Sequence, residues 1–353
     1  MRRVGVLLLG AIALGCGDDD GDGEVDAAVM DASPPADLFM ADAPPSDMPA
    51  PACAGCPAEA PWSCEQCLPA PLQEVTAAVL DGTIVIAGGF ESTIRIVGTV
   101  RQLDPSVGVW QELPALPAMR HHLSLVAMDG DLYAIGGMDS LAFEALADCW
   151  VLRAGASEWT SIASLPEPRA AAGAAAIGGE IVVGAGQGLG ANSDAQLAAA
   201  APALIYDPET DEWREGASIP TPREHVASFA HDGELWILGG RSISLEPTMD
   251  VVEIYDPEAN EWRAGPTMPT PHGGFAAAVL DGVAYVGGGE ERDRALQTFE
   301  ALDLTTMEWS SAAPIPTPRH GHAMAGVDGR VWVIGGANEP VFAAVPTVET
   351  FTP

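Results

Sequence analysis

Residues 322–336, HAMAGVDGRVWVIGG, join two short apolar runs through Asp328 and Gly329 and end in Gly335 and Gly336. Asp-Gly is a favoured two-residue hairpin turn because both positions accept a positive φ. A pair of glycines lets the end of a strand pass close to a neighbouring backbone. The stretch therefore predicts a tight antiparallel hairpin near the end of the chain.

This arrangement occurs six times along the chain. The copies end at Gly89, Gly137, Gly186, Gly240, Gly289 and Gly336, with spacings of 48, 49, 54, 49 and 47 residues, and in the third copy Ala185 replaces the first glycine. The first five units also share a tryptophan that stands seven residues after a leucine or tyrosine: Trp110, Trp159, Trp213, Trp262 and Trp309. A self-similar period near fifty residues indicates a repeat architecture.

Each unit predicts four short antiparallel strands, since apolar runs of five to eight residues are closed by Gly, Pro and Asp. One such sheet cannot bury both of its faces, whereas units packed around an axis bury them all as a β-propeller. The glycine pair, the aromatic residue and Trp seven apart, the Pro-Arg step and the period near fifty resemble the Kelch repeat family over residues 62–353. The resemblance implies an all-β, six-bladed Kelch-type β-propeller, and we expect a monomer.

The N-terminal part of this region predicts how the ring closes. The sixth unit ends at Pro353 without its tryptophan strand, whereas Trp62 lies nineteen residues before Asp81, as Trp159 lies nineteen before Gly178. Residues 61–68 should therefore supply the outer strand of the last blade, which seals exposed strand edges. We place the propeller at residues 61–353.

The segment before the propeller predicts export. Residues 1–16, MRRVGVLLLGAIALGC, resemble a bacterial lipoprotein signal with Cys16 as the lipidated residue, and plain secretion is the alternative. Residues 17–60 hold eleven acidic and no basic residues, which predicts a disordered tether. We expect a protein anchored by lipid in the cell envelope, at the outer membrane, in the periplasm or at the cell surface. The net charge of −35 disfavours nucleic acid and makes a lipid anchor the only expected membrane contact.

Two Cys-x-x-Cys pairs flank the start of the propeller, Cys53 with Cys56 and Cys64 with Cys67. Such pairs can bind zinc or an iron–sulfur cluster, or remain free thiols, but in an exported chain disulfides are favoured. Residues three apart on an extended strand are about 10 Å apart, which is too far for a bond between Cys64 and Cys67. We therefore predict bonds from the first pair to the second.

The Kelch resemblance implies that the loops entering the innermost strands and the loops after the glycine pairs share one face, around the mouth of the central channel. The equivalent positions of the entering loops hold Arg120, Arg169, Arg223, His272 and Arg319, with Leu72 in the first unit. On a very acidic protein, a ring of arginines indicates an anionic ligand. The alternative interpretation is that these arginines hold neighbouring loops together.

Histidines follow the arginines of the second, fourth and sixth units. We interpret His122, His225 and His322 as equivalent positions on alternate blades, which could face one another across the axis. A three-histidine zinc site needs nitrogens about 2 Å from one ion, and we expect a six-bladed channel to be too wide for that. We therefore expect structural histidines and no metal site, while His121, His320 and Glu224 could add acid–base groups at the mouth.

The third loop after a glycine pair is the longest, with twenty residues from Gly186 to Tyr206. Its Gln187, Asn192, Ser193 and Asp194 could contact a ligand, and residues 194–201 could form one or two helical turns. Residues 186–191 approach a dinucleotide-binding glycine pattern, but no βαβ unit surrounds them, so we expect no cofactor.

These features favour a non-catalytic binding or scaffold protein that recognises a protein or glycan at the channel mouth. The alternative is a sugar mutarotase or epimerase acting on an anionic sugar such as sialic acid, because N-acetylneuraminate epimerase is a similar exported six-bladed Kelch protein. A deep pocket with a convergent Glu or His and an Arg would favour the enzyme. Fold alone decides neither.

Overall fold

A computed structural model describes residues 53, 56, 59–190, 193–243 and 247–353 of the chain. These residues belong to one compact unit, Met48–Pro353. The expectations for the signal segment, Cys16 and most of the tether lie outside the described residues. Within them, no helix has the length and apolar character needed to cross a membrane.

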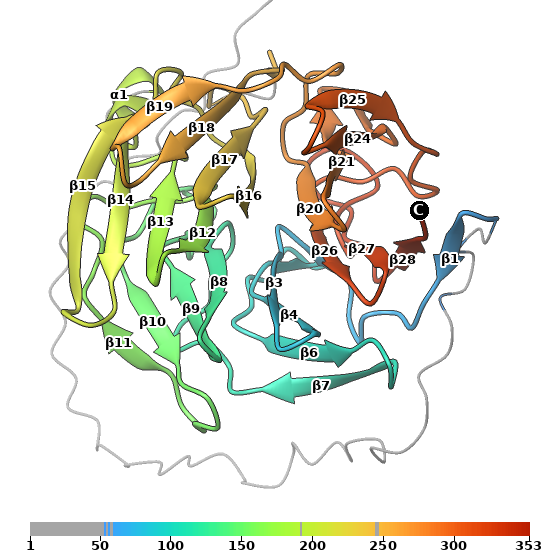
Figure 1. Ribbon diagram of the computed structural model, residues 1–353. Helices are drawn as coiled ribbons and strands as arrows, with labels where there is room; N and C mark the ends of the chain where they lie inside the picture. The colour runs from blue at the N-terminus through green and yellow to red at the C-terminus, as the bar shows by residue number, and fades with distance from the viewer. Residues whose placement is uncertain (1–52, 54–55, 57–58, 191–192, 244–246) are drawn as a thin grey trace, which may run out of the picture. The chain divides into compact units, whose positions relative to one another are not determined.

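Six four-stranded antiparallel sheets form six blades, as the sequence predicts (Figure 1). From the innermost to the outermost strand, blade 1 contains β3 (Thr76–Leu80), β4 (Thr83–Ala87), β6 (Val100–Asp104) and β7 (Val109–Leu113), and blade 2 contains β8 (Ser124–Met128), β9 (Asp131–Ile135), β10 (Cys149–Leu152) and β11 (Thr160–Ile162). In the same order, blade 3 contains β12 (Gly173–Ile177), β13 (Glu180–Gly184), β14 (Pro202–Asp207) and β15 (Glu212–Ser218); blade 4 contains β16 (Ala227–His231), β17 (Glu234–Leu238), β18 (Val252–Asp256) and β19 (Glu261–Ala264). Blade 5 contains β20 (Ala276–Leu280), β21 (Val283–Gly287), β24 (Phe299–Asp303) and β25 (Glu308–Ser311); blade 6 contains β26 (Ala323–Val327), β27 (Arg330–Ile334), β28 (Val348–Phe351) and β1 (Trp62–Cys64).

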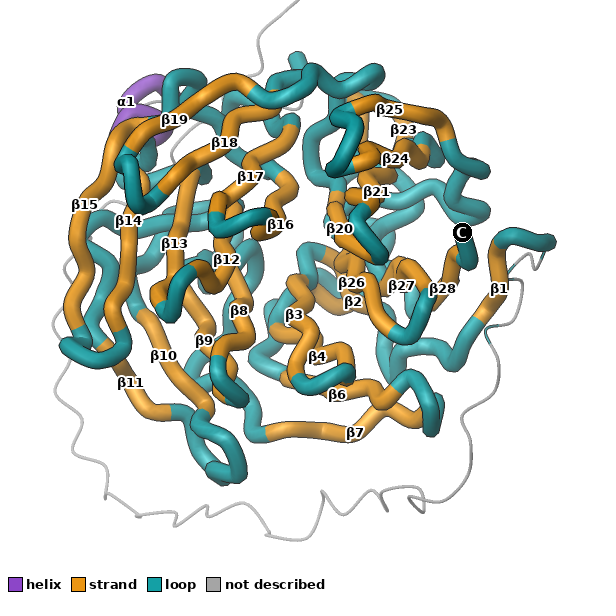
Figure 2. Tube along the Cα trace, in the orientation of Figure 1, coloured by secondary structure: helices purple, strands orange, loops and turns teal. Residues whose placement is uncertain are grey.

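Short elements complete the described structure. They are β2 (Leu72–Gln73) paired with β5 (Phe90–Glu91), β22 (Glu290–Glu291) paired with β23 (Arg294–Ala295), and the helix α1 (Ser193–Ala199) in the long third loop. The strands β3, β8, β12, β16, β20 and β26 each contact the innermost strands of the two adjacent blades, so they surround the central axis (Figure 2).

The turn chemistry of the repeat accounts for this geometry. Asp81 and Gly82, like the Asp-Gly pairs of the other units, have positive φ values, 48° and 76°, in the turn between the two inner strands. The glycine pairs lie where a blade contacts the next one. A Cβ on Gly136 would lie 2.1 Å from the carbonyl oxygen of Arg169, so only glycine allows this approach of blade 2 to blade 3.

The ring closes as the sequence predicts. Strand β1 pairs antiparallel with β28, with Trp62 opposite Phe351 and Cys64 opposite Glu349. The indole N–H of Trp62 donates to the carbonyl of Ala313 in the preceding blade at 3.1 Å. Trp159 makes the equivalent bond from blade 2 to Pro114 of blade 1 at 2.7 Å, so Trp62 has the place of a repeat tryptophan.

Apolar side chains fill the spaces between adjacent blades. Between blades 6 and 1, for example, Trp332 and Ile334 pack with Ile84, Leu103 and Trp110 in one buried cluster. Since every blade has a neighbour on each side, both faces of each sheet are buried from solvent.

The two Cys-x-x-Cys pairs form cross-linked disulfides, Cys53 with Cys67 and Cys56 with Cys64, as predicted. They join residues preceding the propeller to the end of the closing strand β1, at Cys64, and to the segment that follows it, at Cys67. Cys149 is buried on β10, where burial raises the pKa of its thiol to about 12.

Candidate functional site

Six equivalent residues form a belt around the channel, and each stands where the chain enters an innermost strand. We call them the inner belt: Glu74, His122, Ala171, His225, Gly274 and Gly321. All six have a positive φ, between 50° and 68°. That conformation suits glycine and strains other residues, so the bulky polar side chains on blades 1, 2 and 4 stand at positions where small residues are the favourable choice.

Backbone hydrogen bonds between adjacent blades hold the inner belt together. The N–H of Ala171 donates to the carbonyl of His122 at 2.9 Å, and the N–H of His225 donates to the carbonyl of Ala171 at 3.0 Å. Gly274 and Gly321 continue the series at 3.1 and 2.8 Å. The channel is therefore narrow at this level, since neighbouring blades touch through their backbones.

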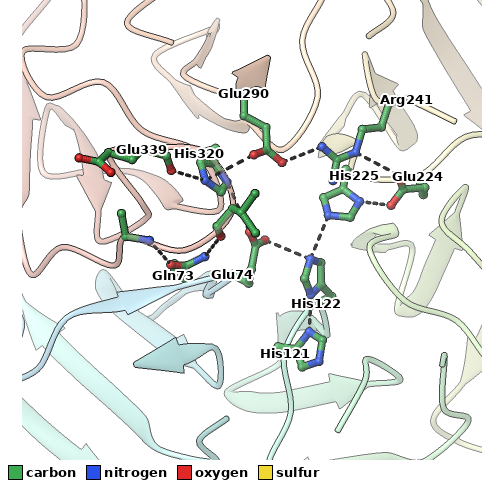
Figure 3. Close-up of polar contacts among 12 residues, drawn as sticks. Gln73, Glu74, His121, His122, Glu224, His225, Arg241, Glu290, His320 and Glu339 are labelled. Atoms are coloured by element: carbon green, nitrogen blue, oxygen red, sulfur yellow. Dashed lines mark hydrogen bonds and ion pairs between the residues drawn. The ribbon is translucent and has the colours of Figure 1, made fainter. Parts of the chain in front are cut away.

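Three side chains of the inner belt converge because of this narrowness (Figure 3). The Nε2 atoms of His122 and His225 are 2.9 Å apart, and the Nε2 of His122 lies 3.2 Å from a carboxylate oxygen of Glu74. Glu74, His122 and His225 are the one group of three within the described ranges whose ligand atoms lie close enough together to hold a metal ion.

The structure corrects two sequence-based expectations about the histidines. The channel is not too wide for histidines of alternate blades to meet, because the inner belt brings His122 and His225 into contact. His322 does not join them, because it stands three residues after Arg319, one position beyond the inner belt, where Gly321 takes the equivalent place. His322 is buried and lines a channel cavity of about 190 Å³ instead.

A second set of polar residues lies next to the inner belt, on the side of the loops that follow the glycine pairs. These residues line a pocket of about 490 Å³, which we call the mouth pocket. Arg241 donates to Glu224 at 3.1 Å and to Glu290 at 2.7 Å, and it is buried between them. His320 lies 3.5 Å from both Glu74 and Glu290 (Figure 3). The pocket thus combines three carboxylates, three imidazoles and one guanidinium.

Burial and mutual contact set the charges in the mouth pocket. Burial opposes ionisation of Glu74, but His122 and His320 outweigh it and hold the pKa of its carboxyl well below its usual range. Burial lowers the pKa of His122, and burial with the nearby Arg241 lowers that of His225 further. Burial with the adjacent His122 lowers the pKa of His121 to about 3. For His320, the carboxylate of Glu74 3.5 Å away outweighs burial and raises the pKa.

The predicted ring of arginines lies inside the blades. Arg120, Arg169, Arg223 and Arg319 are all buried, and none of them lines the mouth pocket. Arg319, for example, donates to the carbonyls of Gly335 and Thr347 and pairs with Glu349, so it joins the entering loop to the ends of two strands of its own blade. His272 replaces arginine in blade 5, with its Nδ1 2.7 Å from the carbonyl oxygen of Gly288. These contacts agree with the alternative interpretation, in which the residues hold loops together.

Other predicted residues do reach the pocket. His122, Glu224 and His225 line it, as does Gln187 of the third loop. Asn192 lies outside the described residues. The helix α1 matches the expected helical turns, and its Gln196 also lines the pocket.

Three charged pocket residues escaped the sequence analysis: Glu74, Arg241 and Glu290. Arg241 and Glu290 directly follow glycine pairs, and Glu74 stands two residues after Leu72, as His122 stands two after Arg120. The usable signal is a position rather than a motif. Comparing the residue after each glycine pair, and the second residue after each Pro-Arg step, across all six units would have selected all three.

Exposed apolar side chains stand on the loops after the glycine pairs of blades 1, 2, 3 and 6, and three of them line the pocket. We call them the apolar rim: Ile94, Leu141, Phe143, Leu189, Val341 and Phe342, each between 36 and 55% exposed. Two buried glutamines hold two of these loops. The amide of Gln73 donates to the carbonyl of Val341 at 2.7 Å, and that of Gln187 donates to the carbonyl of Phe143 at 2.8 Å. The loops that carry Val341 and Phe143 are therefore held in place by hydrogen bonds from adjacent blades.

Six sheets around a channel with a polar mouth define the chain as a six-bladed β-propeller. Two family models match the repeats of this chain. The KLHDC2/KLHL20/DRC7 Kelch-repeats domain matches residues 163–336, and the Kelch motif matches residues 71–117 and 119–166. The chain is a Kelch-repeat protein.

Curated relatives match over part of their length. Kelch-like protein terF of Aspergillus terreus is 27% identical over 191 residues, which are 52% of this chain and 42% of the relative. Beta-scruin of Limulus polyphemus is 27% identical over 48% of this chain and 19% of its own length, and Kelch-like protein 35 of Mus musculus is 28% identical over 50 and 36%. The chain thus spans less than half the length of each relative.

A solved structure shares the fold over most of the chain. The structure of YjhT superposes with a TM-score of 0.69 at 17% identity and covers 81% of this chain and 96% of its own. At this identity the likeness extends to the fold alone.

Proposed function

We propose that this chain is a cell-envelope binding protein that takes a protein partner on its channel-mouth face. Propellers built from Kelch repeats generally mediate protein binding. The observation that carries the proposal is the apolar rim around a polar pocket. Exposed apolar residues gathered on one face are typical of interaction surfaces, and ordered loops on a rigid scaffold lower the entropy cost of binding.

The rim and the pocket suit different parts of such a partner. Phe143, Val341 and Phe342 line the pocket entrance and offer apolar contact area. Below them, the carboxylates and imidazoles can receive one polar side chain or a sugar unit attached to the partner. An anionic group meets little positive charge from the protein itself, since Arg241 is already engaged by Glu224 and Glu290.

The proposed location rests on the N-terminal sequence and the cysteines. A lipidated Cys16 would anchor the propeller in the envelope, and disulfides are typical of oxidising compartments outside the cytosol. The pairs Cys53–Cys67 and Cys56–Cys64 support this location.

Cross-linking from the mouth tests the binding proposal. A photo-reactive residue at position 141 of the full-length chain should capture a protein from intact cells of the source organism, and Phe143→Ser with Phe342→Ser should abolish the capture. Val107→Ser is the matched control, because Val107 is 62% exposed in the turn between β6 and β7, at the opposite end of the blade from the glycine-pair loops. Equal capture by the rim variant and the wild type would contradict the proposal.

A sugar mutarotase or epimerase is the second candidate, because a Glu, a His and an Arg converge in one pocket. Glu74 and His122 are 3.2 Å apart beside Arg241, in a space wide enough for one monosaccharide. Sialic acid and neutral aldoses should then interconvert between anomers or epimers faster with the wild type than with Glu74→Gln, as followed by NMR. If none of these sugars is interconverted faster, the enzyme proposal is wrong and only the binding proposal remains.

A further inference from the structure

We propose that Glu74, His122 and His225 bind a divalent transition-metal ion, with Zn²⁺ the best match, and leave a coordination position open to the mouth pocket. The three residues belong to blades 1, 2 and 4 and meet through the inner belt. Two imidazoles and one carboxylate form a ligand set that zinc takes in sites with an open position. Imidazole ligands disfavour Ca²⁺ and Mg²⁺, which prefer oxygen.

Hydrogen bonds fix the proton positions on His122. His121 has its Nε2 3.1 Å from the carbonyl oxygen of Ser140, which can only accept, so this nitrogen carries the hydrogen. The Nδ1 of neutral His121 is then an acceptor, and it lies 2.5 Å from the Nδ1 of His122. His122 therefore carries its hydrogen on Nδ1, and its Nε2 presents a lone pair to the channel.

The same reasoning applies to His225. Its Nδ1 contacts the carboxylate of Glu224, which accepts hydrogen bonds from Arg241 as well. His225 thus carries its hydrogen on Nδ1, and its Nε2 also presents a lone pair. A carboxylate that orients a histidine from behind is a regular feature of metal sites.

Three acceptors consequently face one another without a hydrogen between them. The lone pairs on the Nε2 atoms of His122 and His225 lie 2.9 Å apart, and an oxygen of Glu74 lies 3.2 Å from the first. With both imidazoles neutral, such an arrangement is repulsive, so either a second proton on a histidine or a metal ion has to stand among the three atoms. A metal ion would remove the repulsion, and it gives a reason for bulky polar side chains to stand at three belt positions whose positive φ favours small residues.

The surroundings suit a bound ion. Gly321 leaves space for the carboxylate of Glu74, since a Cβ there would lie 2.4 Å from one of its oxygens. All three ligand residues line both the channel cavity and the mouth pocket, so an ion among them is reachable from the mouth. An ion would also add two positive charges to the pocket, which would let it take an anionic group of the proposed partner. This last consequence rests on the proposed function, whereas the metal site itself does not.

Zinc binding to the full-length chain tests the site. Protein stripped with a chelator and dialysed against Zn²⁺ should retain one more equivalent of zinc than His122→Gln, His225→Gln or Glu74→Gln, as measured by elemental analysis. Glu224→Gln should keep the site with about tenfold weaker affinity, because it removes only the group that orients His225. His231→Gln is the matched control and should bind like the wild type, since His231 lies near Asp232 at the other end of β16.

Cobalt substitution gives an independent readout should a variant unfold. Co²⁺ added to the stripped wild type should produce visible absorption bands of a low-coordinate nitrogen and oxygen site, and added Zn²⁺ should remove them. Equal zinc content in the wild type and the folded ligand variants, or no cobalt bands in the wild type, would overturn the proposal. The rim variant Phe143→Ser with Phe342→Ser should still bind zinc, which separates this site from partner binding.

Discussion

Trp62 lies directly opposite Phe351, and their ring centroids are 5.3 Å apart, although the two residues come from opposite ends of the propeller sequence. Trp62 also contacts the ring of Phe299 at 5.1 Å, across the space between blades 5 and 6. The first strand and the last strand therefore depend on each other, and blade 6 is complete only when both are in place.

This pairing predicts a large loss of stability from a residue far from the glycine-pair motifs. Trp62→Ala should lower the free energy of unfolding by about 3–5 kcal/mol, as for other buried tryptophans, because it leaves a cavity beside Phe299 and Phe351. Urea unfolding followed by circular dichroism measures the change. Val107→Ala, in an exposed turn, should change it by less than about 0.5 kcal/mol. A similar small effect of Trp62→Ala would mean that β1 does not close the ring.

The disulfides predict a stability that depends on reducing agent. They close loops with sequence separations of 14 and 8 residues around β1, the outermost strand of blade 6. Reduction should lower the free energy of unfolding by about 2–5 kcal/mol, since it releases the unfolded chain from both constraints. Urea titrations with and without a phosphine reductant measure this. A variant with serine at Cys53, Cys56, Cys64 and Cys67 should show no response to the reductant, and a wild type that also shows none would contradict the prediction.

Most of the fold can be predicted from the sequence because the repeat acts as its own reference. Six glycine pairs fix the number of blades, and Trp62 fixes how the ring closes, since the outer strand of the sixth unit is otherwise missing. These features recur because packing against identical neighbours imposes the same steric demand in every blade.

The site is less predictable for the opposite physical reason. Residues that recur, such as Arg169 and Arg319, are the ones the fold needs, and they are buried within their own blades. Residues that differ between blades, such as Glu74 and Arg241, are free to serve the pocket. A search guided by recurrence therefore finds the scaffold first, and the convergence of side chains from different blades appears only in three dimensions.

Because the repeat arginines are buried, we expect their substitution to lower the stability of the fold rather than to weaken ligand binding directly. Arg223 pairs with Glu253 and donates to the carbonyls of Gly239 and Ile237 in its own blade. Arg223→Met should cost about 3–5 kcal/mol, because it leaves the buried carboxylate of Glu253 unpaired. Arg223→Met with Glu253→Met should recover part of this loss in thermal unfolding. If the double variant is no more stable than the single one, the ion pair is not the source of the effect.

We expect the carboxyl of Glu300 in blade 5 to make the melting temperature of the protein fall in acid. Burial opposes ionisation of Glu300, but the nearby His272, 3.6 Å away, and a hydrogen bond from Thr270 outweigh it and lower the pKa of its carboxyl. A carboxyl whose pKa is lower in the folded state stabilises the protein above its unfolded pKa of about 4.3 and loses that contribution as the pH falls through the folded value. Wild type should therefore exceed Glu300→Gln in melting temperature by more at pH 7 than at pH 3. A difference that is constant with pH would exclude this role.

Adding one methyl group by a Gly→Ala substitution should affect zinc binding at the inner belt but not at an ordinary hairpin turn. Gly321 and Gly329 both have a positive φ, 56° and 67°, so alanine at either position costs about 1 kcal/mol of backbone strain. A Cβ at Gly329 meets open space, whereas a Cβ at Gly321 would lie 2.4 Å from a carboxylate oxygen of Glu74 and would displace it. Both variants should carry this strain, and Gly321→Ala should lose somewhat more stability in urea because it also displaces the carboxylate; only Gly321→Ala should weaken zinc binding, because it moves one of the three ligands away from His122. Equal zinc affinity in the two variants would mean that the position of the Glu74 carboxylate does not matter to the ion.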